Sequence, residues 1–242
     1  AEPALRKVAE EGWILASTGG GDVTRPRGNA VKTDGGYLVS GHKRFVSQAP
    51  ASTVMSTMFT YDDPEQGRRV LNVGVPMNAP GVEVFETWDA LGMRGTASHD
   101  VMLQDVFVPE DKVLANRPYD VLDGPLQVIF SIAFPIISGA YLGVAEGAFA
   151  HAVAAANADE PAVQRTVGLM RDRLQVAGWA LDGALAVVGD DPTPSMDTVA
   201  AVMAAKREIG LAGIEVCDLA MDVVSGQAFF KGSPIERAHR DI

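Results

Sequence analysis

A glycine-rich segment near the beginning of the chain carries groups suited to holding an anion. It reads Ser17-Thr18-Gly19-Gly20-Gly21-Asp22. Glycines let backbone N–H groups approach a ligand closely, and two hydroxyls can donate hydrogen bonds beside them. The segment is not a Walker loop, because no Lys-Ser/Thr pair follows it, and it is not a G-x-G-x-x-G motif after a strand. Two interpretations stay open, a plain glycine-rich turn and a cradle for a phosphate or cofactor.

A second segment places an aromatic ring beside a hydroxyl. In Lys43-Arg44-Phe45-Val46-Ser47-Gln48, the alternation of a strand puts Phe45 and Ser47 on one face. Such a pair can bracket a flat heterocycle, the ring by packing and the hydroxyl by hydrogen bonding. The alternative is an edge strand with one buried phenylalanine.

Two later segments combine glycine with charge. Arg94 lies between two glycines, where it can position a carboxylate or phosphate or be an ordinary surface arginine. Toward the end of the chain, Ser225-Gly226 is typical of a helix stop. Glu236 and Arg240 form an i,i+4 pair, which is typical of a solvated helix face.

The remaining reactive residue types indicate packing rather than chemistry. Cys217 has no basic activator nearby, and a single cysteine excludes a disulfide framework. The four histidines have no metal-ligand spacing, so we expect structural or surface roles for them. No Gly-x-Ser-x-Gly elbow supports an α/β-hydrolase.

The first half of the chain, up to about Val121, consists of short β-rich runs separated by turn residues. Asp34-Gly35-Gly36 predicts a hairpin turn, and residues 62–67 predict another turn. Strands at this spacing without intervening helices favour an antiparallel sandwich or barrel over a Rossmann sheet. The predicted strands cover residues 37–40, 45–47, 54–61, 70–75, 82–85, and a last pair at 101–103 and 106–108.

The second half predicts three long helices: residues 125–156, residues 161–188 with Pro161 near the first position, and a third helix that Ser195 caps and that runs to about Val224. Gly139, Gly143 and Gly147 share one face of the first, which lets another helix approach closely. Helices of this length suit an antiparallel bundle that buries its apolar faces against sister subunits. The predicted fold class is therefore α+β. Its regions are the end of an N-terminal helical region (1–12), a middle β domain (13–121) and a C-terminal helical bundle (122–242).

Composition excludes some classes of function. The 242 residues are 47% hydrophobic and 21% charged, as in a globular protein, and the net charge of −11 disfavours a nucleic-acid groove. Val128 to Ala145 carries no charge, but its proline, serines and glycines favour a core or oligomer helix over a membrane span. The first eleven residues lack the apolar core of a secretory leader, so we expect a cytoplasmic protein.

Taken in order, the four segments resemble the acyl-CoA dehydrogenase flavoprotein superfamily. Its members carry Thr-Glu-Pro-x-x-Gly-Ser-Asp, Asn-Gly-x-Lys-x-Trp-Ile-Thr/Ser-Asn, Met-Gly-x-Arg-Gly with Asp-Val-x-Val-Pro, and Gly-Gly-x-Gly-Phe with Pro-x-Glu-Arg-x-x-Arg-Asp. Counterparts run from Ser17 to Asp241, and the most specific are Gly41 to Ser47 and Leu91 to Pro109. Family subunits have a helical N-terminal domain, a middle β domain and a C-terminal four-helix bundle. The resemblance implies that only the last turns of the first domain are present here.

The resemblance implies FAD as cofactor and gives roles to seven residues. Ser47 would hydrogen-bond the N5/O4 edge of the flavin, and Phe45 would pack on the isoalloxazine. Ser17, with the backbone around Gly20 and Gly21, would face the pyrimidine and the pyrophosphate. Ser225 and Gly226 would approach the FAD of a neighbouring subunit in a homodimer or homotetramer.

The implied reaction is α,β-dehydrogenation of an acyl thioester such as an acyl-CoA. A carboxylate would remove the α-proton while the β-hydride leaves for the flavin, and an electron-transfer flavoprotein or similar acceptor would reoxidise FAD.

The chain departs from the family in ways that keep other functions open. The Arg-x-x-Phe-Gly motif that helps to hold the partner's FAD has no match in residues 157–164, and the Glu-Pro of the first motif is missing. Ala133-Phe134 replaces the family's Thr-Arg pair, and Ile132 stands where one subset has its catalytic glutamate. The usual catalytic glutamate would lie past Ile242, so the catalytic residue is unknown. The alternatives are a two-component flavin monooxygenase on the same fold and an inactive assembly subunit.

Overall fold

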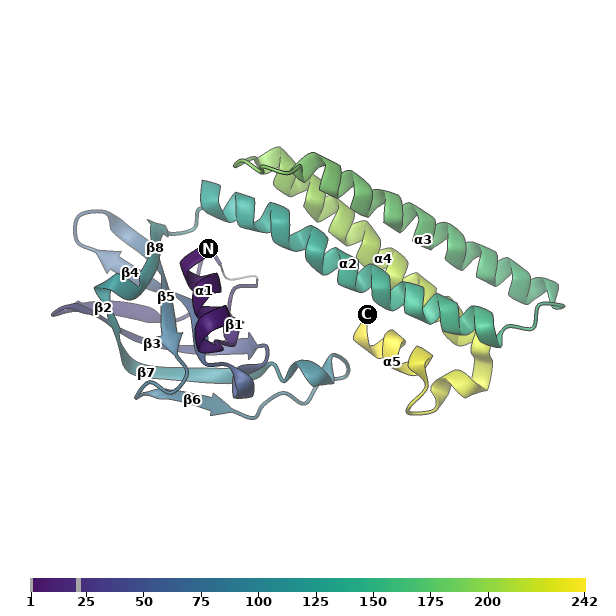
Figure 1. Ribbon diagram of the computed structural model, residues 1–242, viewed down its shortest axis with the longest axis horizontal. Coiled ribbons are helices and arrows are strands. Elements are labelled where there is room, and N and C mark those ends of the chain that lie inside the picture. Colours follow the sequence, from purple (N-terminus) through teal and green to yellow (C-terminus); the bar gives the residue numbers. More distant parts are fainter. Residues whose placement is uncertain (1, 21–22) are drawn as a thin grey trace. The chain divides into compact units, whose positions relative to one another are not determined.

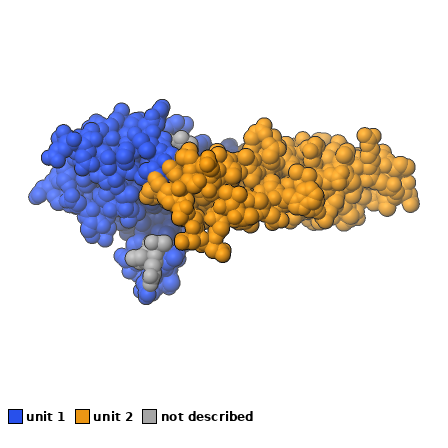
Figure 2. All heavy atoms as spheres, turned by 90° about the horizontal axis from the view of Figure 1, so that it is seen from above, with its two compact units in different colours: residues 1–90, 94–123 blue, residues 91–93, 124–242 orange. Residues whose placement is uncertain are grey.

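The computed structural model describes residues 2–20 and 23–242, which form two compact units (Figure 2). Unit 1 comprises residues 1–90 and 94–123, and unit 2 comprises residues 91–93 and 124–242. The first is rich in strands and the second is helical, so the predicted combination of a β region followed by a helical region is confirmed.

Unit 1 is built on one eight-stranded sheet, preceded by a short helix α1 (Glu2–Glu11) (Figure 1). The strands pair in the order β6-β7-β3-β2-β4-β5-β8, and β1 pairs with β4. Short 3-10 turns η1 (Ala49–Ala51), η2 (Arg94–Thr96) and η3 (Glu110–Lys112) connect some of them. The strands are β1 (Leu15–Ser17), β2 (Asn29–Thr33), β3 (Gly36–Val46), β4 (Val54–Asp63), β5 (Gly67–Pro76), β6 (Val82–Phe85), β7 (His99–Pro109) and β8 (Val113–Pro118).

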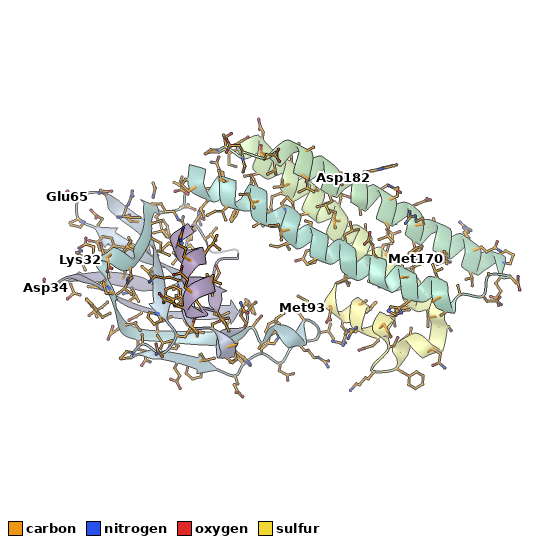
Figure 3. The ribbon with its side chains drawn as sticks, in the orientation of Figure 1. Lys32, Asp34, Glu65, Met93, Met170 and Asp182 are labelled. Carbon is orange, nitrogen blue, oxygen red and sulfur yellow. The ribbon has the colours of Figure 1, made fainter. Side chains whose placement is uncertain are left out.

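The two predicted turns are confirmed and both close antiparallel hairpins. Thr33 pairs with Gly36 across Asp34-Gly35, where Gly35 has the left-handed φ of 72° that this tight turn requires. Asp63 pairs with Gly67, and its carboxylate accepts hydrogen bonds from the backbone N–H of Glu65 and Gln66. Figure 3 labels Asp34 and Glu65 at the tips of these turns.

Two features of the sheet differ from the predictions. The sheet is mixed, because β1 and β2 each pair with β4 in parallel, whereas the antiparallel pattern was expected throughout. These parallel ladders involve only two or three residues, too few to leave a directional signal in the sequence. Residues 101–103 and 106–108 are not a strand pair: both belong to β7, which pairs with β3 on one side and β6 on the other.

The core of unit 1 lies under the long central strands. Residues that alternate along β3, β5 and β7 are buried, and β4 carries an almost continuous buried run. The largest side chains that are almost fully buried in unit 1 include Met55, Phe59, Leu71 and Leu103.

The irregular segment between β1 and β2 is tied to the sheet by side chains that donate to its carbonyl groups. Lys43 donates to the carbonyl of Arg27, Arg117 donates to that of Val23, and Thr60 Oγ1 donates to that of Pro26 at 3.2 Å. Carbonyl groups without a ladder partner need such donors when they are buried. The glycine-rich segment is therefore followed by a well-anchored connection.

Unit 2 is a bundle of three long helices and a short one, with the bounds close to those predicted. They are α2 (Gly124–Ala155), α3 (Pro161–Val188), α4 (Met196–Val224) and α5 (Pro234–Asp241), with a 3-10 turn η4 (Ser225–Phe229) before the last. Ser195 caps α4, since its hydroxyl accepts a hydrogen bond from the N–H of Thr198 at 3.1 Å. Pro161 opens α3 at the position where its missing N–H costs nothing.

Small side chains dominate the packing between the helices of unit 2. Ala145, Ala148 and Ala152 of α2 lie in one buried cluster with Met170 of α3, which Figure 3 labels, and Cys217 of α4. The small side chains let α2 and α4 pack over most of their length.

The predicted glycine face of α2 makes no close helix contact among the described residues, and Gly143 and Gly147 line a hollow together with residues of α5. A Cβ added at Gly139, Gly143 or Gly147 would meet nothing within 4 Å among the described residues. By length and composition alone, α2 is apolar enough to cross a membrane, and 28% of its most apolar window is buried in the bundle.

Candidate functional site

A hollow of about 530 Å³ in unit 1 brings together the two segments that the sequence singles out. This volume is in the range of small-molecule sites. We call the hollow the β1–β3 pocket. Its lining residues are Ser17, Thr18, Gly19, Gly20, Arg27, His42, Lys43, Arg44 and Phe45.

The glycine-rich edge of the pocket is open and offers hydroxyls. Ser17 ends β1 and is exposed, and Gly20 has room for a ligand because nothing lies within 4 Å of an added Cβ. Gly19 has a φ of 139° and a Cβ there would lie 2.9 Å from the side chain of Met58, so the backbone conformation requires glycine. Gly21, also predicted here, lies outside the described residues.

The opposite edge presents an aromatic ring. Phe45 is 68% exposed, with a φ of 58° at an irregularity in the β3–β7 ladder. Its ring lies 6.1 Å from that of Trp88, edge to face at 80°. An exposed phenylalanine held in a sparsely populated conformation is a candidate for ligand contact. It is not the buried phenylalanine of the alternative interpretation.

Ser47 follows directly after β3 and does not line the pocket. It is exposed, while Val46 before it is fully buried. Its hydroxyl lies 2.9 Å from that of Ser98, which in turn lies 2.7 Å from the hydroxyl of Thr96. The backbone carbonyl of Thr96 accepts a 2.7 Å hydrogen bond from the N–H of Gln48.

A hydrogen bond joins the two predicted segments. The side-chain amide of Gln48, next to Ser47, donates to the carbonyl of Leu15 at 3.0 Å. Leu15 is two residues before Ser17 in β1. Ser17, Phe45 and Ser47 therefore lie in one neighbourhood of unit 1, as a shared ligand would require.

The pocket is basic although the protein is acidic. Arg27, Lys43 and Arg44 lie in its lining, whereas the whole chain carries a net charge of −11. Lys43 is only 3% exposed, and its ammonium group donates to the carbonyl of Met58 and lies 4.1 Å above the Phe59 ring. A buried ammonium group below a basic rim favours an anionic ligand.

One carboxylate outside the pocket lining contacts two side chains of the lining. Asp100 of β7 lies 2.7 Å from Nε2 of His42 and 3.8 Å from Nε of Arg44. Through these contacts Asp100, on the neighbouring strand, holds the side chains of His42 and Arg44 in place. Among the described residues, the pocket lining itself contains no aspartate or glutamate.

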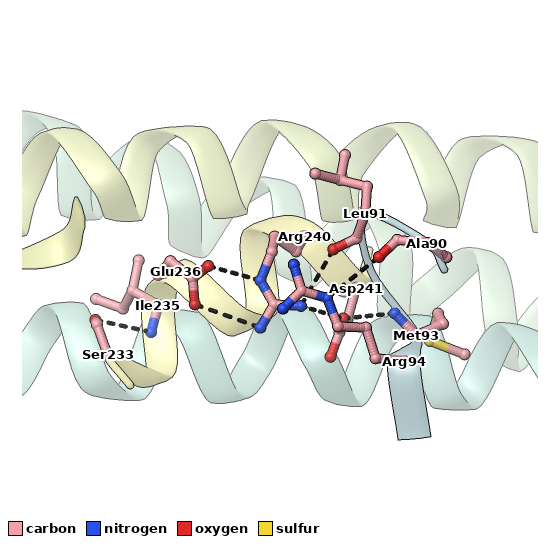
Figure 4. A network of polar contacts seen from close by, with 9 residues as sticks. All are labelled: Ala90, Leu91, Met93, Arg94, Ser233, Ile235, Glu236, Arg240 and Asp241. Atoms are coloured by element: carbon pink, nitrogen blue, oxygen red, sulfur yellow. Dashed lines mark hydrogen bonds and ion pairs between the residues drawn. The ribbon is translucent and has the colours of Figure 1, made fainter. Parts of the chain in front are cut away.

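Arg94 and the C-terminal segment make different contacts from those expected of a ligand site (Figure 4). Nε of Arg94 donates to the carbonyl of Ala90 at 3.2 Å. Arg240 pairs with Glu236 at 2.6 Å and also donates to the carbonyl of Leu91 at 3.3 Å. The side chains of Glu236 and Arg240 are each less than a quarter exposed, so the pair does not lie on a solvated helix face. It anchors the neighbouring segment that contains Leu91.

Ser225 and Gly226 belong to unit 2, at the end of α4. Ser225 is the C-terminal cap residue, with a φ of 58°, and both residues are exposed. Nothing within 4 Å limits a side chain at Gly226.

Several residues around the pocket could not be found from the sequence. His42, for which a structural or surface role was expected, is exposed and lines the pocket, as do Arg27 and Arg44. Trp88 carries no local signal, and its contact with Phe45 depends on the tertiary fold. Ser98 stands near Arg94 in the sequence, but its contact with Ser47 depends on the pairing of β3 with β7. Among the described residues, no group of three or more His, Cys, Asp or Glu side chains is arranged to hold a metal ion.

Known proteins share the sequence and the fold. Residues 16–106 match the acyl-CoA dehydrogenase middle domain. The putative acyl-CoA dehydrogenase YdbM of Bacillus subtilis (strain 168) is 30% identical, over 98% of this chain and 62% of that protein. The isobutylamine N-hydroxylase of Streptomyces viridifaciens is 27% identical, over 94% of this chain and 61% of that protein.

A solved structure with the same fold contains a flavin. It is KijD3 in complex with FMN and dTDP-3-amino-2,3,6-trideoxy-4-keto-3-methyl-D-glucose, with a TM-score of 0.83 and 26% identity. The alignment covers 99% of this chain and 62% of that one. The chain thus spans a little over three fifths of these relatives, whether compared by sequence or by structure.

The relatives share more than a middle domain, because the alignments extend through the helical unit as well. The two relatives, a putative acyl-CoA dehydrogenase and an N-hydroxylase, are both named as oxidoreductases but for different reactions. Residues 16–106 therefore form an acyl-CoA dehydrogenase middle domain, and the chain has the acyl-CoA dehydrogenase-like fold.

Proposed function

We propose that this protein is a flavin-dependent monooxygenase that binds flavin at the β1–β3 pocket. The observation that carries the proposal is the makeup of the pocket: a glycine edge, hydroxyls, an exposed aromatic ring and a basic rim. Dehydrogenation of an acyl thioester needs a carboxylate base, and Ile132 stands where one subset of the family has it, whereas oxygen transfer from reduced flavin needs no such base.

The pocket residues fit a flavin chemically. A planar ring system needs an aromatic contact and hydrogen-bond donors at its polar edge, which Phe45 and Ser17 in the pocket lining and Ser47 beside it provide. A phosphate needs backbone N–H groups and positive charge, which the segment at Gly20 and the side chains of Arg27 and Arg44 provide. Gly21 would extend the same cradle.

Within this proposal each group has one task. Phe45 packs on the ring system, and Ser47 hydrogen-bonds its N5/O4 edge. The Asp100 carboxylate holds His42 and Arg44 at the rim. Bound reduced flavin supplies the two electrons for reduction of dioxygen, one oxygen atom passing to the substrate and the other to water.

We propose FMN as the preferred flavin, although FAD is the cofactor that the family resemblance implies. KijD3 was solved with FMN, and the Arg-x-x-Phe-Gly motif that helps to hold a partner's FAD has no match in residues 157–164. Ser225 and Gly226 would approach the flavin of a neighbouring subunit in a homo-oligomer, completing the site. An electron-transfer flavoprotein is then unnecessary, because a separate reductase supplies reduced flavin.

Acyl-CoA dehydrogenation is the second candidate. Leu91-Gly92-Met93-Arg94-Gly95 and the similarity to YdbM favour it. In that case an acyl-CoA is the substrate, the base comes from outside the β1–β3 pocket, and an electron-transfer flavoprotein reoxidises FAD. A cytoplasmic location, with no membrane or nucleic-acid partner, is part of both proposals.

One experiment separates the candidates. The protein is mixed anaerobically with photoreduced FMN, then with oxygen and isobutylamine as a probe amine, and oxygen uptake and hydroxylated product are measured. In parallel, the FAD-loaded protein is titrated anaerobically with butyryl-CoA and octanoyl-CoA while the flavin absorbance is recorded. We expect oxygen uptake with product in the first arm and no bleaching in the second.

Bleaching of the oxidised flavin by an acyl-CoA would contradict the monooxygenase proposal and support the dehydrogenase. Absence of flavin binding in both arms would contradict both and favour the assembly subunit.

A further inference from the structure

Three hydroxyl groups form a continuous chain from the half-buried Thr96 through the buried Ser98 to the exposed Ser47 directly after β3. The Oγ1 of Thr96 lies 2.7 Å from the Oγ of Ser98, which lies 2.9 Å from the Oγ of Ser47. Ser98 is 5% exposed, whereas Ser47 is exposed. We call this set the hydroxyl chain.

The number of hydrogens in the hydroxyl chain limits the directions in which its hydrogen bonds can run. Each hydroxyl has one hydrogen and accepts through its lone pairs. Ser98 can donate to only one of its two neighbours, so it cannot satisfy both Ser47 and Thr96 as donor. Two arrangements use the Ser98 hydrogen within the hydroxyl chain: Thr96 donates to Ser98 and Ser98 to Ser47, or Ser47 donates to Ser98 and Ser98 to Thr96.

The two arrangements give Ser47 opposite properties. In the first, Ser47 accepts from Ser98 and its own hydrogen is free for a ligand. In the second, the hydrogen of Ser47 is used on Ser98 and its lone pairs are free to accept. The atoms do not move between the two, because rotation of three hydroxyl hydrogens is sufficient.

Backbone contacts hold the hydroxyl chain in place. Val46 pairs with His99 in the β3–β7 ladder, and the N–H of Gln48 donates to the carbonyl of Thr96 at 2.7 Å. Gln48 and Ala97 have left-handed φ values of 55° and 43°, which non-glycine residues adopt only when their surroundings enforce it. The contacts of Ser98 are therefore a built feature of this loop pair and not a chance approach of two surface serines.

We infer that Ser98 is a positioning residue that lets Ser47 serve both redox states of the flavin. This inference rests on the proposed function, in which Ser47 contacts the N5 edge. Oxidised N5 is an acceptor and selects the arrangement in which Ser47 donates. Reduced N5 carries a hydrogen and selects the reverse arrangement, in which Ser47 accepts and passes its own hydrogen to Ser98.

Removal of the Ser98 hydroxyl should therefore affect the two redox states unequally. With reduced flavin, Ser98→Ala leaves the hydrogen of Ser47 without an acceptor, whereas with oxidised flavin it removes only a donor to a lone pair. Unpaired donors are more costly than under-used acceptors. We expect Kd for reduced FMN to rise by about fivefold more than Kd for oxidised FMN.

The test measures both dissociation constants, by fluorescence for oxidised FMN and by anaerobic absorbance titration for photoreduced FMN. The proteins are the wild type, Ser47→Ala, Ser98→Ala and the Ser47→Ala/Ser98→Ala double variant. Ser40→Ala is the matched control, because the Ser40 hydroxyl bonds Asp105 in the same unit and takes no part in the chain. The unequal effect of Ser98→Ala should vanish in the Ser47→Ala background, since Ser98 acts through Ser47.

Thr96→Val provides a second probe should Ser98→Ala lower the thermal midpoint so far that binding cannot be measured. This substitution keeps the shape of the side chain and removes the Thr96 hydroxyl from the hydroxyl chain. We expect Kd for reduced FMN to rise more than Kd for oxidised FMN, as for Ser98→Ala.

The outcomes separate the two claims. Equal changes in both constants for Ser98→Ala, or an unequal effect that persists without the Ser47 hydroxyl, would overturn the role of Ser98. If Ser47→Ala still altered FMN binding, the proposed function would stand. Failure of the wild type to bind FMN in either redox state would overturn both claims together.

Discussion

Near the β1–β3 pocket, individual residues adopt conformations that the folded state has to enforce. Phe45, Gln48 and Ala97 all have positive φ values, which cost roughly 1–3 kcal/mol each for residues with a Cβ. Hydrogen bonds offset this cost, such as the one that the Gln48 side-chain amide donates to the carbonyl of Leu15 and the one between the hydroxyls of Ser47 and Ser98. Backbone strain at exposed positions beside a pocket is expected where the conformation favours ligand binding at the expense of stability.

Phe45→Gly tests this trade between stability and binding. Glycine relieves the positive φ, so the ligand-free protein should be more stable by about 1 kcal/mol in urea unfolding. Loss of the ring should raise Kd for FMN about tenfold. Phe107→Ala, an exposed phenylalanine of β7 outside the pocket lining, is the control and should leave Kd unchanged. An unchanged Kd for Phe45→Gly would remove Phe45 from the site.

Cys217 shows how burial decides reactivity. It is fully buried in α4, and burial, with a smaller effect of Asp218, raises the pKa of the thiol from 9.0 to about 11. At pH 8 only about one folded molecule in a thousand carries the thiolate. Iodoacetamide should therefore leave Cys217 unmodified in the native protein and alkylate it in urea, as read by mass spectrometry.

The same shift makes stability depend on pH in a defined direction. The folded thiol keeps its proton up to about pH 11, while the unfolded thiol loses it from about pH 9. This contribution is complete below pH 9 and is lost as the pH rises toward 11, with a slope of at most about 1.4 kcal/mol per pH unit. The wild type should lose stability more steeply than Cys217→Ala over this window. Parallel curves would contradict the shifted pKa.

At the scale of elements, close backbone approaches define the fold of unit 1. Gly28 has a φ of 95°, and a Cβ there would lie 2.6 Å from the carbonyl oxygen of Ser40 and 2.9 Å from the Cα of Gly41. The segment before β2 therefore lies directly against β3, which brings Arg27 and Lys43 into the same pocket.

Gly28→Ala should be far more damaging than Gly35→Ala. Gly35 also has a positive φ, but its added Cβ would meet open space, so about 1 kcal/mol of backbone strain is expected. At Gly28 strain and a backbone clash combine, and about 3 kcal/mol or more is expected. Urea unfolding followed by the fluorescence of the tryptophans measures both. Equal losses would show that the approach to Ser40 does not limit the packing.

The elements that follow local rules were predictable from the sequence. Ser195 as a cap, Pro161 as a first-turn residue and Asp34-Gly35 as a turn each act within a few residues, and each was confirmed. The parallel pairing of β1 and β2 with β4 was not predictable, because direction depends on the path of the chain and not on alternation. The contact of Trp88 with Phe45 was not predictable for the same reason.

At the scale of the whole molecule, unit 2 leaves large apolar side chains without cover in this chain. Ile136 of α2 is 70% exposed and Trp179 of α3 is 64% exposed, and several other large apolar residues of these helices are also exposed. Exposed apolar surface on helices of this length is typical of subunit interfaces. The arrangement agrees with the proposal that a neighbouring subunit completes the flavin site through Ser225 and Gly226.

Sedimentation equilibrium should accordingly give a mass at least twice the 25.5 kDa of the chain. Ile136→Glu and Trp179→Glu should each shift the equilibrium toward the monomer, because an unpaired charge at an apolar interface is costly. Ile136→Leu and Trp179→Phe are the matched controls and should retain the assembly. A monomeric wild type at 100 µM would contradict the proposed oligomer.

The central claim is that the β1–β3 pocket holds a flavin, and direct titration tests it most directly. Wild-type protein is titrated with oxidised FMN and, anaerobically, with reduced FMN, and each is repeated with riboflavin to isolate the contribution of the phosphate. We predict one FMN per chain with a Kd of about 10 µM or tighter in at least one redox state, and weaker binding of riboflavin because the basic rim has no phosphate to hold. Folded protein that binds neither flavin in either redox state would contradict the account.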